Sequence, residues 1–557
     1  MAAPNIDQDG LRWGYKRSRL FGKDPLWTRE PEMSAIESSV RQELHLNPDE
    51  VCNVSFMAEG ALNKLYAIEA QGHQDCVLRV SLPVDPVHKT AREVATLRFL
   101  ESKSSLPVPR VILYSTDRKD IGFEWILMTR LPGTSLRDKW RHTSLQAKNN
   151  IARRLAGYQA ELFDLRFHGI GGLREEEAKA ENVESVTDGL VERRFVVNRI
   201  GSVEFFYDDH IRRDVPRGPY VSSEEWLQAR LDLFIGDQDR IIERGPNDQD
   251  TSDEDHKEER SDGKSMPNTD EHNVVLTPII SEQEKTHTSA DVKGQSNGEH
   301  CSGDLSEADD EDDDIDEEDV RDARWLKNLA TILRNQVVWL AFSDVSESEP
   351  EPSMLYHQDL HEGNILIDAS GEMTGIVDWE CVSASPLWAA CQKPKLLEGR
   401  SREECPDRDT YGDYNPDAWG GQGPDPKEKD SDGKGITYWE HLEEHEQTVM
   451  SKTFFEEMEQ RCPSWTIMYR GSLMRRNLSG AIDLMEGRFR GPFEVDQWCR
   501  AVRRGCCDDD LEARLQADRE DREVDHGPTM DEIEGSWEVW KDLRNAQDAV
   551  LARALQN

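Results

Sequence analysis

Apolar and polar positions in residues 51–130 follow two periods, which together predict a small β-rich unit with one helix. Short runs rich in β-branched and aromatic residues have the length of strands, and a Gly-containing turn joins the first two. Between the later runs, Val94, Leu97 and Leu100 recur at helical spacing. The predicted order is strand, strand, helix and strand, over residues 66–69, 76–80, 90–101 and 124–128.

From about residue 134 the apolar pattern becomes helical. Two stripes recur at intervals of three or four residues, the spacing of one buried helix face. They consist of Ile151, Leu155, Tyr158, Leu162 and Leu165, and of Leu326, Leu329, Leu333, Val337 and Leu340. A Ser-Ser-Glu-Glu run at 222–225 has the composition of a helix start. The chain is therefore expected to have an α+β fold with a small β-rich lobe and a large, mainly helical lobe.

Composition changes sharply after Arg244. Residues 246–322 hold 27 acidic and 6 basic residues, a net charge of −21 within the −44 of the whole chain. Such a segment buries too little apolar surface to offset the entropy of ordering it, so we expect a disordered acidic insert, to which protein partners could bind. Residues 401–435 are also polar, and residues beyond them are mostly charged helix with anchors such as Trp465 and Trp498.

These patterns divide the chain into seven expected parts. In order they are an N-terminal extension (1–50), the small lobe (51–130), the first part of the large lobe (131–245), the acidic insert (246–322), a catalytic segment (323–400), a polar loop (401–435) and a C-terminal helical region (436–557).

Charge and cysteine content limit the class of protein. A net charge of −44 argues against binding to nucleic acid or to an anionic membrane, because both require clustered Lys and Arg. The ten cysteines show no C-x-x-C pair, so neither a zinc site nor a disulfide framework is indicated. The first 31 residues have no apolar core of a signal peptide, and Asp7, Asp9 and Asp24 argue against a mitochondrial presequence. No apolar run long enough to span a membrane is present, and a cytoplasmic location is expected.

The segment 356–380 carries the clearest chemistry. It reads His357-Gln358-Asp359-Leu360-His361-Glu362-Gly363-Asn364, then a short strand, a turn, and a second strand that ends at Asp378. A hairpin of this size returns the chain, so Asp378 is expected beside Asn364. A carboxylate and an amide oxygen facing one pocket are ligands that Mg²⁺ accepts.

Asp359, at the mouth of the same loop, could accept a hydrogen bond from an incoming hydroxyl and orient it for attack on a γ-phosphate. The alternative is that Asp359 and Asn364 are turn residues and Asp378 a solvated strand end.

A second candidate lies in the small lobe. Kinases pair a cation on the third strand with a glutamate on the following helix, and the corresponding residues here are Arg79 and Glu93. Arg79 would then hold the α- and β-phosphates of a nucleotide through its fork of donors. The alternative is an ordinary ion pair without a role in binding.

These segments resemble the aminoglycoside phosphotransferase (APH) and choline kinase-like superfamily, particularly its fungal phosphotransferase-family group. The resemblance rests on Glu59–Tyr66, Leu78–Pro83, His357–Asn364 and Ile376–Glu380, and covers about residues 51–245 and 323–400. It implies a bilobal protein-kinase-like fold that uses ATP and Mg²⁺. The chain departs from the pattern at Arg79, where the family has Lys, and at Gln358, where antibiotic kinases usually have Gly.

The resemblance also implies roles for individual residues. Asp359 would be the catalytic base, and Asn364 and Asp378 would bind the metal. Gly60 and Asn63 would lie in the strand-turn-strand over the phosphates, with Arg79 and Glu93 behind them. Met128 to Arg130 would form the hinge beside adenine.

Three functions remain open. The first is a Mg-ATP-dependent kinase for a hydroxyl on a small molecule, for which an acidic cleft would suit a cationic acceptor. The second, suggested by Arg79 and the acidic insert, is a pseudokinase that acts as a scaffold. A protein kinase is disfavoured by Asp378-Trp379-Glu380 in place of Asp-Phe-Gly and by the lack of an Ala-Pro-Glu element.

Overall fold

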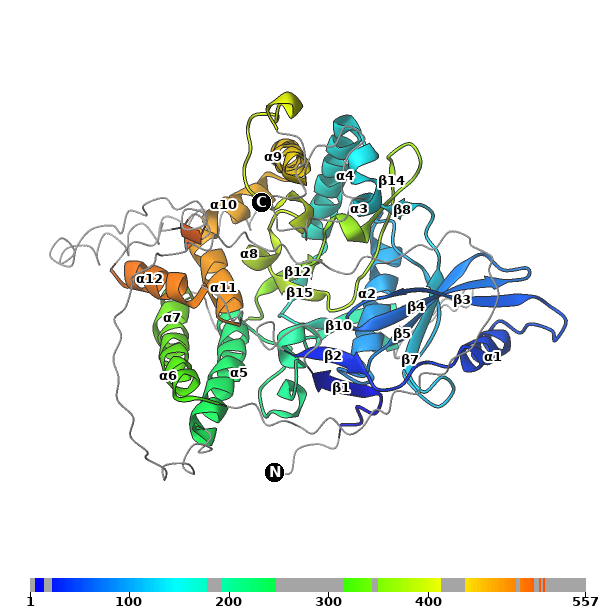
Figure 1. The fold of residues 1–557 in the computed structure, drawn as a ribbon, viewed down its shortest axis with the longest axis horizontal. Helices are drawn as coiled ribbons and strands as arrows, with labels where there is room; N and C mark the ends of the chain where they lie inside the picture. Colours follow the sequence, from blue (N-terminus) through cyan, green and yellow to red (C-terminus); the bar gives the residue numbers. More distant parts are fainter. Residues whose placement is uncertain are drawn as a thin grey trace, which may run out of the picture. The chain divides into compact units, whose positions relative to one another are not determined.

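The computed structural model describes residues 6–14, 23–177, 193–246, 315–342, 349–411, 436–486 and 491–504, together with 510–511 and 514–515. The chain forms two compact units (Figure 1), one of residues Met1–Gly236 and Leu326–Asn557, the other of Asp237–Trp325. Described residues of the second unit belong mainly to the end of α5 (Ser223–Arg244) and the start of α6 (Glu317–Ile332).

Most of the predicted acidic insert lies outside the described residues. Its last part, from Glu317, forms the first turns of α6 instead of a disordered segment. Glu317, Glu318 and Asp319 occupy the first turn of that helix, where acidic side chains interact favourably with the helix dipole.

The small lobe is built on one antiparallel sheet with the strand order β3-β4-β5-β7-β6. Its strands are β3 (Cys52–Glu59), β4 (Asn63–Ala70), β5 (Cys76–Ser81), β6 (Val111–Ser115) and β7 (Glu124–Thr129). Helix α2 (His88–Lys103) connects β5 to β6 and buries Val94, Leu97 and Leu100 against the core. The predicted strands and helix of this lobe are therefore confirmed.

The predicted boundary at residue 51 is wrong for the described part of the N-terminal segment. Strands β1 (Leu11–Gly14) and β2 (Asp24–Trp27) form a two-stranded sheet, and α1 (Met33–Glu43) follows them. Ile36 and Val40 of α1 are buried in the same apolar cluster as Tyr66 and Leu78 of the central strands. A segment that supplies core side chains is part of the lobe, which thus has two helices.

The large lobe also contains short strands, of which the sequence predicts only the two in the hairpin that precedes Asp378. They are β8 (Thr134–Ser135), β9 (Phe167–His168), β10 (Gly172–Glu177), β11 (Arg193–Asn198), β12 (Pro352–Tyr356), β13 (Ile365–Ile367), β14 (Met373–Ile376) and β15 (Ser383–Pro386). They form the sheets β10-β11, β15-β12-β9 and β14-β13-β8. Gly133 precedes β8 with φ +111°, and a Cβ there would lie 2.5 Å from the Ile367 carbonyl oxygen, so only glycine allows this approach to the β13–β14 hairpin.

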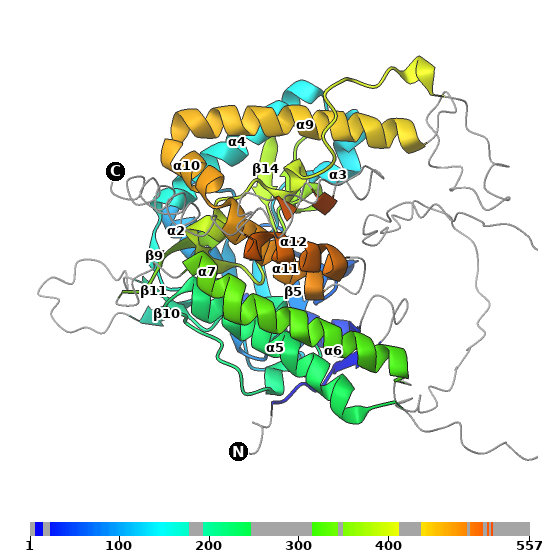
Figure 2. The ribbon, with the colours of Figure 1, turned by 90° about the vertical axis from the view of Figure 1, so that its left-hand side faces the viewer.

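Helices make up the rest of the large lobe, as predicted (Figure 2). They are α3 (Leu136–Lys139), α4 (Leu145–Asp164), α5, α6, α7 (Val338–Phe342), α8 (Leu387–Ala390), α9 (Ile436–Arg461), α10 (Pro463–Gly471), α11 (Leu473–Glu486) and α12 (Gly491–Arg503). Short helical turns cover Trp140–His142 (η2), Val203–Phe205 (η3), His210–Arg212 (η4), Leu333–Val337 (η5), Glu362–Asn364 (η6), Lys395–Leu397 (η7) and Arg408–Thr410 (η8).

The α9 helix lies along α4, and Trp388, Trp465 and Trp498 are buried in one apolar core. None of the helices in the described part of the chain combines the length and apolar character needed to cross a membrane. The predicted division into a β-rich small lobe and a mainly helical large lobe is confirmed.

Candidate active site

The loop of residues 357–364, for which the sequence predicts a catalytic role and which is called the catalytic loop below, connects β12 to the β13–β14 hairpin. Ile365 of β13 pairs with Ile376 of β14, and the Val377 N–H donates to the Asn364 carbonyl oxygen over 3.0 Å. The chain therefore returns to its starting point, and Asp378 follows directly on a residue bonded to Asn364. The structure places these two residues beside each other, as the spacing predicts; their role as metal ligands stays a prediction.

The backbone around Asp378 is held by buried aromatic packing. Asp378 has φ +66°, in the left-handed region, where a residue other than glycine costs about 1–3 kcal/mol. Trp379 is buried, and its Nε1–H donates to the Ile376 carbonyl oxygen over 2.9 Å. The His357 ring packs edge-on against Trp379, with centroids 4.8 Å apart, and its Nε2 lies 3.1 Å from the Val377 carbonyl oxygen. These contacts keep Asp378 in its strained conformation.

The oxygen donors near Asp378 fit a divalent metal ion. The Asn364 Nδ2 donates to the Asp359 carbonyl oxygen over 2.9 Å, so the amide oxygen of Asn364 is not used in this hydrogen bond. One carboxylate oxygen of Asp378 binds Arg79, and among the described residues no side chain bonds the other. An amide oxygen and a carboxylate are hard ligands of the kind that Mg²⁺ takes.

Asp359 is partly exposed and has two cationic or polar neighbours. Lys395 Nζ lies 2.8 Å from its Oδ1, and His361 Nε2 lies 3.5 Å from its Oδ2. His361 and Lys395 hold the pKa of the Asp359 carboxyl well below its usual range. A carboxylate that stays ionised can accept a hydrogen bond from an alcohol at any physiological pH.

His361 is itself oriented by the loop. Its Nδ1 accepts the Gly363 N–H over 2.8 Å and lies 2.9 Å from Arg137 Nη2, so the ring proton of a neutral imidazole belongs on Nε2, toward Asp359. A Cβ at Gly363 would lie 2.4 Å from the imidazole, which explains glycine at this position.

Arg79 joins the small lobe to the catalytic segment. Its guanidinium contacts Glu93 Oε1 at 2.9 Å, Asp378 Oδ1 at 2.8 Å and Glu380 Oε2 at 2.8 Å. Arg79 and Glu93 are almost fully buried. Burial lowers the pKa of Arg79, but the three carboxylates raise it by more. The pKa of Arg79 therefore lies well above its ordinary value. The predicted Arg79–Glu93 pair is present, while its role in nucleotide binding stays a prediction.

Lys89 adds a second buried cation to this network. Its Nζ lies 2.7 Å from Glu380 Oε2 and 2.8 Å from Asn63 Oδ1. Burial raises the pKa of Glu380, but Arg79 and Lys89 outweigh it and lower that pKa to about 2. Two cations thus face three carboxylates, those of Glu93, Asp378 and Glu380, and the cluster keeps one net negative charge, which favours a bound cation.

The remaining predicted nucleotide-binding residues have different surroundings. Asn63 is buried, and its side chain is committed to Lys89, Ser81 and Glu380. Gly60 is exposed in the β3–β4 turn. Met128 is buried in the core, and the exposed Arg130 donates its backbone N–H to Asp75 over 3.0 Å. In the part of the chain that the structure describes, no hydrogen bond or ion pair joins the side chain of Met128 or Arg130 to Asp359 or Asp378, and the predicted contacts of all four residues with a nucleotide remain untested.

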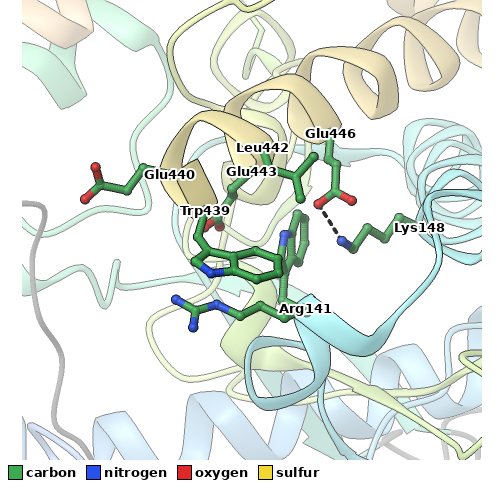
Figure 3. Close-up of a pocket in the computed structure, with 8 residues that line it drawn as sticks. Arg141, Lys148, Trp439, Glu440, Leu442, Glu443 and Glu446 are labelled. Carbon is green, nitrogen blue, oxygen red and sulfur yellow. Dashed lines mark hydrogen bonds and ion pairs between the residues drawn. The ribbon is translucent and has the colours of Figure 1, made fainter. Parts of the chain in front are cut away.

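A pocket of about 180 Å³ lies between the end of α3, the start of α4 and the start of α9 (Figure 3). Its lining is two indoles, two cations, three carboxylates and a leucine: Trp140, Arg141, Lys148, Trp439, Glu440, Leu442, Glu443 and Glu446. Lys148 Nζ is buried over the Trp140 ring at 4.3 Å and pairs with Glu446 at 2.5 Å, and Arg141 lies over Trp439 at 5.0 Å.

This pocket is electrostatically linked to the catalytic loop. Burial, followed by the nearby carboxylate of Glu362, raises the pKa of Glu443 to about 7. Glu362 belongs to η6 and binds Arg137 at 2.7 Å. Glu440 points away from the other carboxylates (Figure 3). The pocket therefore presents aromatic surface and negative charge beside the segment that holds Asp359.

Sequence comparison gives the family. Residues 53–222 and 297–389 match the model of the phosphotransferase enzyme family, APH. These two stretches of the chain are similar to members of that family. The resemblance to the aminoglycoside phosphotransferase superfamily, predicted from the catalytic loop and Asp378-Trp379-Glu380, is confirmed.

Named relatives cover only part of this chain and of their own length. A subtelomeric hrmA-associated cluster protein of Aspergillus fumigatus is 31% identical over 172 residues, which are 30% of this chain and 33% of that protein. Altered inheritance of mitochondria protein 9, mitochondrial, of Candida tropicalis is 30% identical over 132 residues, 22% of this chain and 21% of the relative. The chain thus spans at most about a third of the curated relatives it matches.

The expected cytoplasmic location is contradicted by these relatives. Proteins of several yeasts to which part of this chain is similar carry a mitochondrial designation in their names. Acidic residues near the N-terminus are therefore not a sufficient reason to exclude a mitochondrial location.

Solved structures of similar architecture are distant in sequence. One is a thermostable mutant of aminoglycoside phosphotransferase APH(4)-Ia with ADP and hygromycin B, at 12% identity and a TM-score of 0.34, which covers 85% of this chain and 97% of the other. Another is ADP-bound aminoglycoside phosphotransferase APH(2'')-Ib, at 9% identity and a TM-score of 0.35, with 82% and 92% covered. Scores this low carry no argument about the substrate of this chain.

Sequence reasoning missed Lys89, Glu380 and Lys395 as members of the site. Lys89 lies one helical turn before Glu93, and Glu380 lies two residues after Asp378, so both carried a local signal. Lys395 carried none, because only the tertiary structure brings it to Asp359.

Proposed function

We propose that this chain is an ATP- and Mg²⁺-dependent phosphotransferase that moves the γ-phosphate of ATP to a hydroxyl group of a small molecule. One observation carries the proposal. Asn364 donates its side-chain N–H to the Asp359 carbonyl oxygen, and Arg79 forms ion pairs with both Glu93 and Asp378, so hydrogen bonds and ion pairs link residues of the predicted site.

Each of these residues has a separate role in the proposed reaction. Asp359 accepts a hydrogen bond from the acceptor hydroxyl and takes its proton as the new bond forms, a role that contributes about 10²- to 10⁴-fold to the rate. Asn364 and Asp378 would hold the metal, and Mg²⁺ bound there would neutralise phosphate charge. Arg79 is fixed by Glu93 and presents its remaining donors beside Asp378.

The pocket at Trp140 and Trp439 suggests a cationic acceptor. Indole faces and carboxylates are the groups that bind ammonium ions in proteins. Lys148 and Arg141 already lie over the two indoles and Glu446 pairs with Lys148, so Glu443 is the carboxylate left for an acceptor amine. The test pairs hydroxylated amines with their neutral alcohol analogues as acceptors. A preference for the amines that Glu443→Gln reduces supports this assignment, and equal use of both would contradict it.

A scaffold function is the second candidate, and one contact favours it. Arg79 forms an ion pair with one carboxylate oxygen of Asp378, the residue that a kinase would need for binding the metal. If this ion pair persists in the presence of nucleotide, the chain would bind partners without catalysing transfer.

Calorimetric titration of the purified full chain with ATP, with and without Mg²⁺, separates the two candidates. Asp378→Asn is the test variant, and Glu372→Gln, exposed at the other end of the same hairpin, is the matched control. Mg²⁺-dependent binding that Asp378→Asn abolishes and Glu372→Gln retains supports the phosphotransferase. The absence of binding in both conditions would contradict it and favour the scaffold.

A further inference from the structure

Lys395 places an ammonium group on the carboxylate of the catalytic loop. Its Nζ lies 2.8 Å from Asp359 Oδ1, although 36 residues separate the two in the chain. No other side chain among the described residues forms an ion pair with Asp359 at so short a distance. The pair therefore involves the same carboxylate to which the proposed acceptor hydroxyl would donate.

The backbone holds Lys395 at this place. The next residue, Leu396, donates its N–H to the carbonyl oxygen of Leu360, the neighbour of Asp359, over 2.9 Å. Leu396 and Leu397 are fully or almost fully buried, at 0% and 2% exposure. A backbone hydrogen bond and two buried anchors thus fix η7 against the catalytic loop, independently of the ion pair itself.

Stability does not account for the ion pair. The side chains of Lys395 and Asp359 are 53% and 40% exposed, and ion pairs at such exposure stabilise folds little, because water screens them and ordering a long side chain costs entropy. An exposed ammonium on a fixed backbone can also move from one anionic partner to another close by without being buried first. These properties suit a group that changes partner during a reaction.

We propose that Lys395 is a catalytic residue of the phosphotransfer proposed above, on which this inference rests. In the resting protein its ammonium neutralises Asp359. When an acceptor hydroxyl hydrogen-bonds to Asp359, Lys395 donates instead to a non-bridging oxygen of the phosphoryl group that lies in line with that hydroxyl. It thereby stabilises the charge spread over the phosphoryl oxygens in the transition state.

The step balances with the groups already named. The bond between the acceptor oxygen and the γ-phosphorus forms as the bond from that phosphorus to the β,γ-bridging oxygen breaks. The electron pair of the broken bond leaves with the nucleoside diphosphate, and the hydroxyl proton passes to the Asp359 carboxylate. Lys395 keeps its proton throughout and acts by charge alone.

The test compares Lys395→Met and Lys395→Arg with Lys393→Met, a control in the same segment. Each full-length variant is titrated with a non-hydrolysable ATP analogue and Mg²⁺, and separately with ADP, Mg²⁺ and tetrafluoroaluminate, which mimics the phosphoryl group in transfer. We expect Lys395→Met to bind the ATP analogue within about twofold of wild type and to bind the tetrafluoroaluminate complex roughly tenfold or more weakly. Lys395→Arg should recover part of that loss, and Lys393→Met should behave as wild type in both titrations.

The outcomes separate the two proposals. Equal tetrafluoroaluminate binding by Lys395→Met and wild type, or a wild-type protein that binds ADP and Mg²⁺ but not tetrafluoroaluminate, overturns the role of Lys395 and leaves the nucleotide site intact. A wild-type protein that binds no nucleotide overturns both. Thermal denaturation of each variant identifies any loss caused by misfolding, and the partly conservative Lys395→Arg supplies a second measurement if Lys395→Met does not fold.

Discussion

The guanidinium of Arg79 lies 2.8 Å from Oδ1 of Asp378 and 2.9 Å from Oε1 of Glu93. Arg79 belongs to β5, Glu93 to α2, and Asp378 to the segment after β14, so one buried side chain ties the small lobe to the catalytic segment. A third carboxylate, Glu380, shares the same guanidinium. The charge of Arg79 is therefore needed by the fold as well as by the proposed nucleotide site.

Arg79→Met should strongly destabilise the protein. Removal of one partner from a buried charge network leaves the other charges uncompensated, which typically costs about 3–5 kcal/mol. Urea unfolding followed by fluorescence measures the free energy of unfolding. Lys119→Met is the control, because its ion pair with Asp117 is exposed, and it should leave the free energy of unfolding nearly unchanged. Similar stabilities of the two variants would show that Arg79 is not important to the fold.

Asp359→Asn should reduce transfer without damaging the fold. The side chain is 40% exposed and its ion pair is screened by water, so we expect the free energy of unfolding to change by less than about 1 kcal/mol. Loss of the proton acceptor should lower the turnover number by about 10²- to 10⁴-fold, with nucleotide binding retained. The measurement is phosphate transfer or ATP turnover together with calorimetric binding. Undiminished turnover would remove Asp359 from the proposed mechanism.

Ile36→Ala should destabilise the small lobe. Ile36 is fully buried in the cluster of Tyr66 and Leu78, and truncation of a buried isoleucine to alanine costs about 2–5 kcal/mol. Met33→Ala in the same helix is the control, because Met33 is 41% exposed. Chemical denaturation of both variants provides the comparison. If the two lose equally little stability, α1 does not belong to the folded core.

Glu443 should make the stability of the protein depend on pH near neutrality. Its pKa in the folded protein is about 7, above the ordinary value of 4.5, because burial and nearby carboxylates disfavour its charge. The folded state therefore binds this proton more tightly than the unfolded state. The resulting stabilisation is complete below about pH 4.5 and is lost as pH rises through 7, with a loss on the order of 2 kcal/mol.

Unfolding of wild type and Glu443→Gln at about pH 5 and pH 8 measures this effect. The substitution should remove that part of the pH dependence, since glutamine does not titrate. The carboxylate of Glu440 points away from the other acids (Figure 3). Glu440→Gln should therefore show the same change in the free energy of unfolding with pH as the wild type. If the free energy of unfolding of Glu443→Gln changes with pH as it does in the wild type, the pH dependence comes from other groups.

The sequence by itself determined the parts of the site that are close in the chain. Asn364 and Asp378 meet because a short hairpin joins them, and Arg79 faces Glu93 because the strand and the following helix are consecutive elements. Local pattern also predicted β4, β5, β7 and α2 of the small lobe and the helical character of the large one. Each of these features depends on spacing within a few tens of residues, which the order of amino acids encodes directly.

Only the tertiary structure decided which distant residues join them. Lys395 reaches Asp359 through the packing of η7, α1 enters the core of the small lobe, and residues near Trp140 meet residues near Trp439 to form a pocket. No local period relates these partners, because their proximity follows from how whole elements bury their apolar faces. The chain specifies that packing only as a whole, through the sum of many weak contacts.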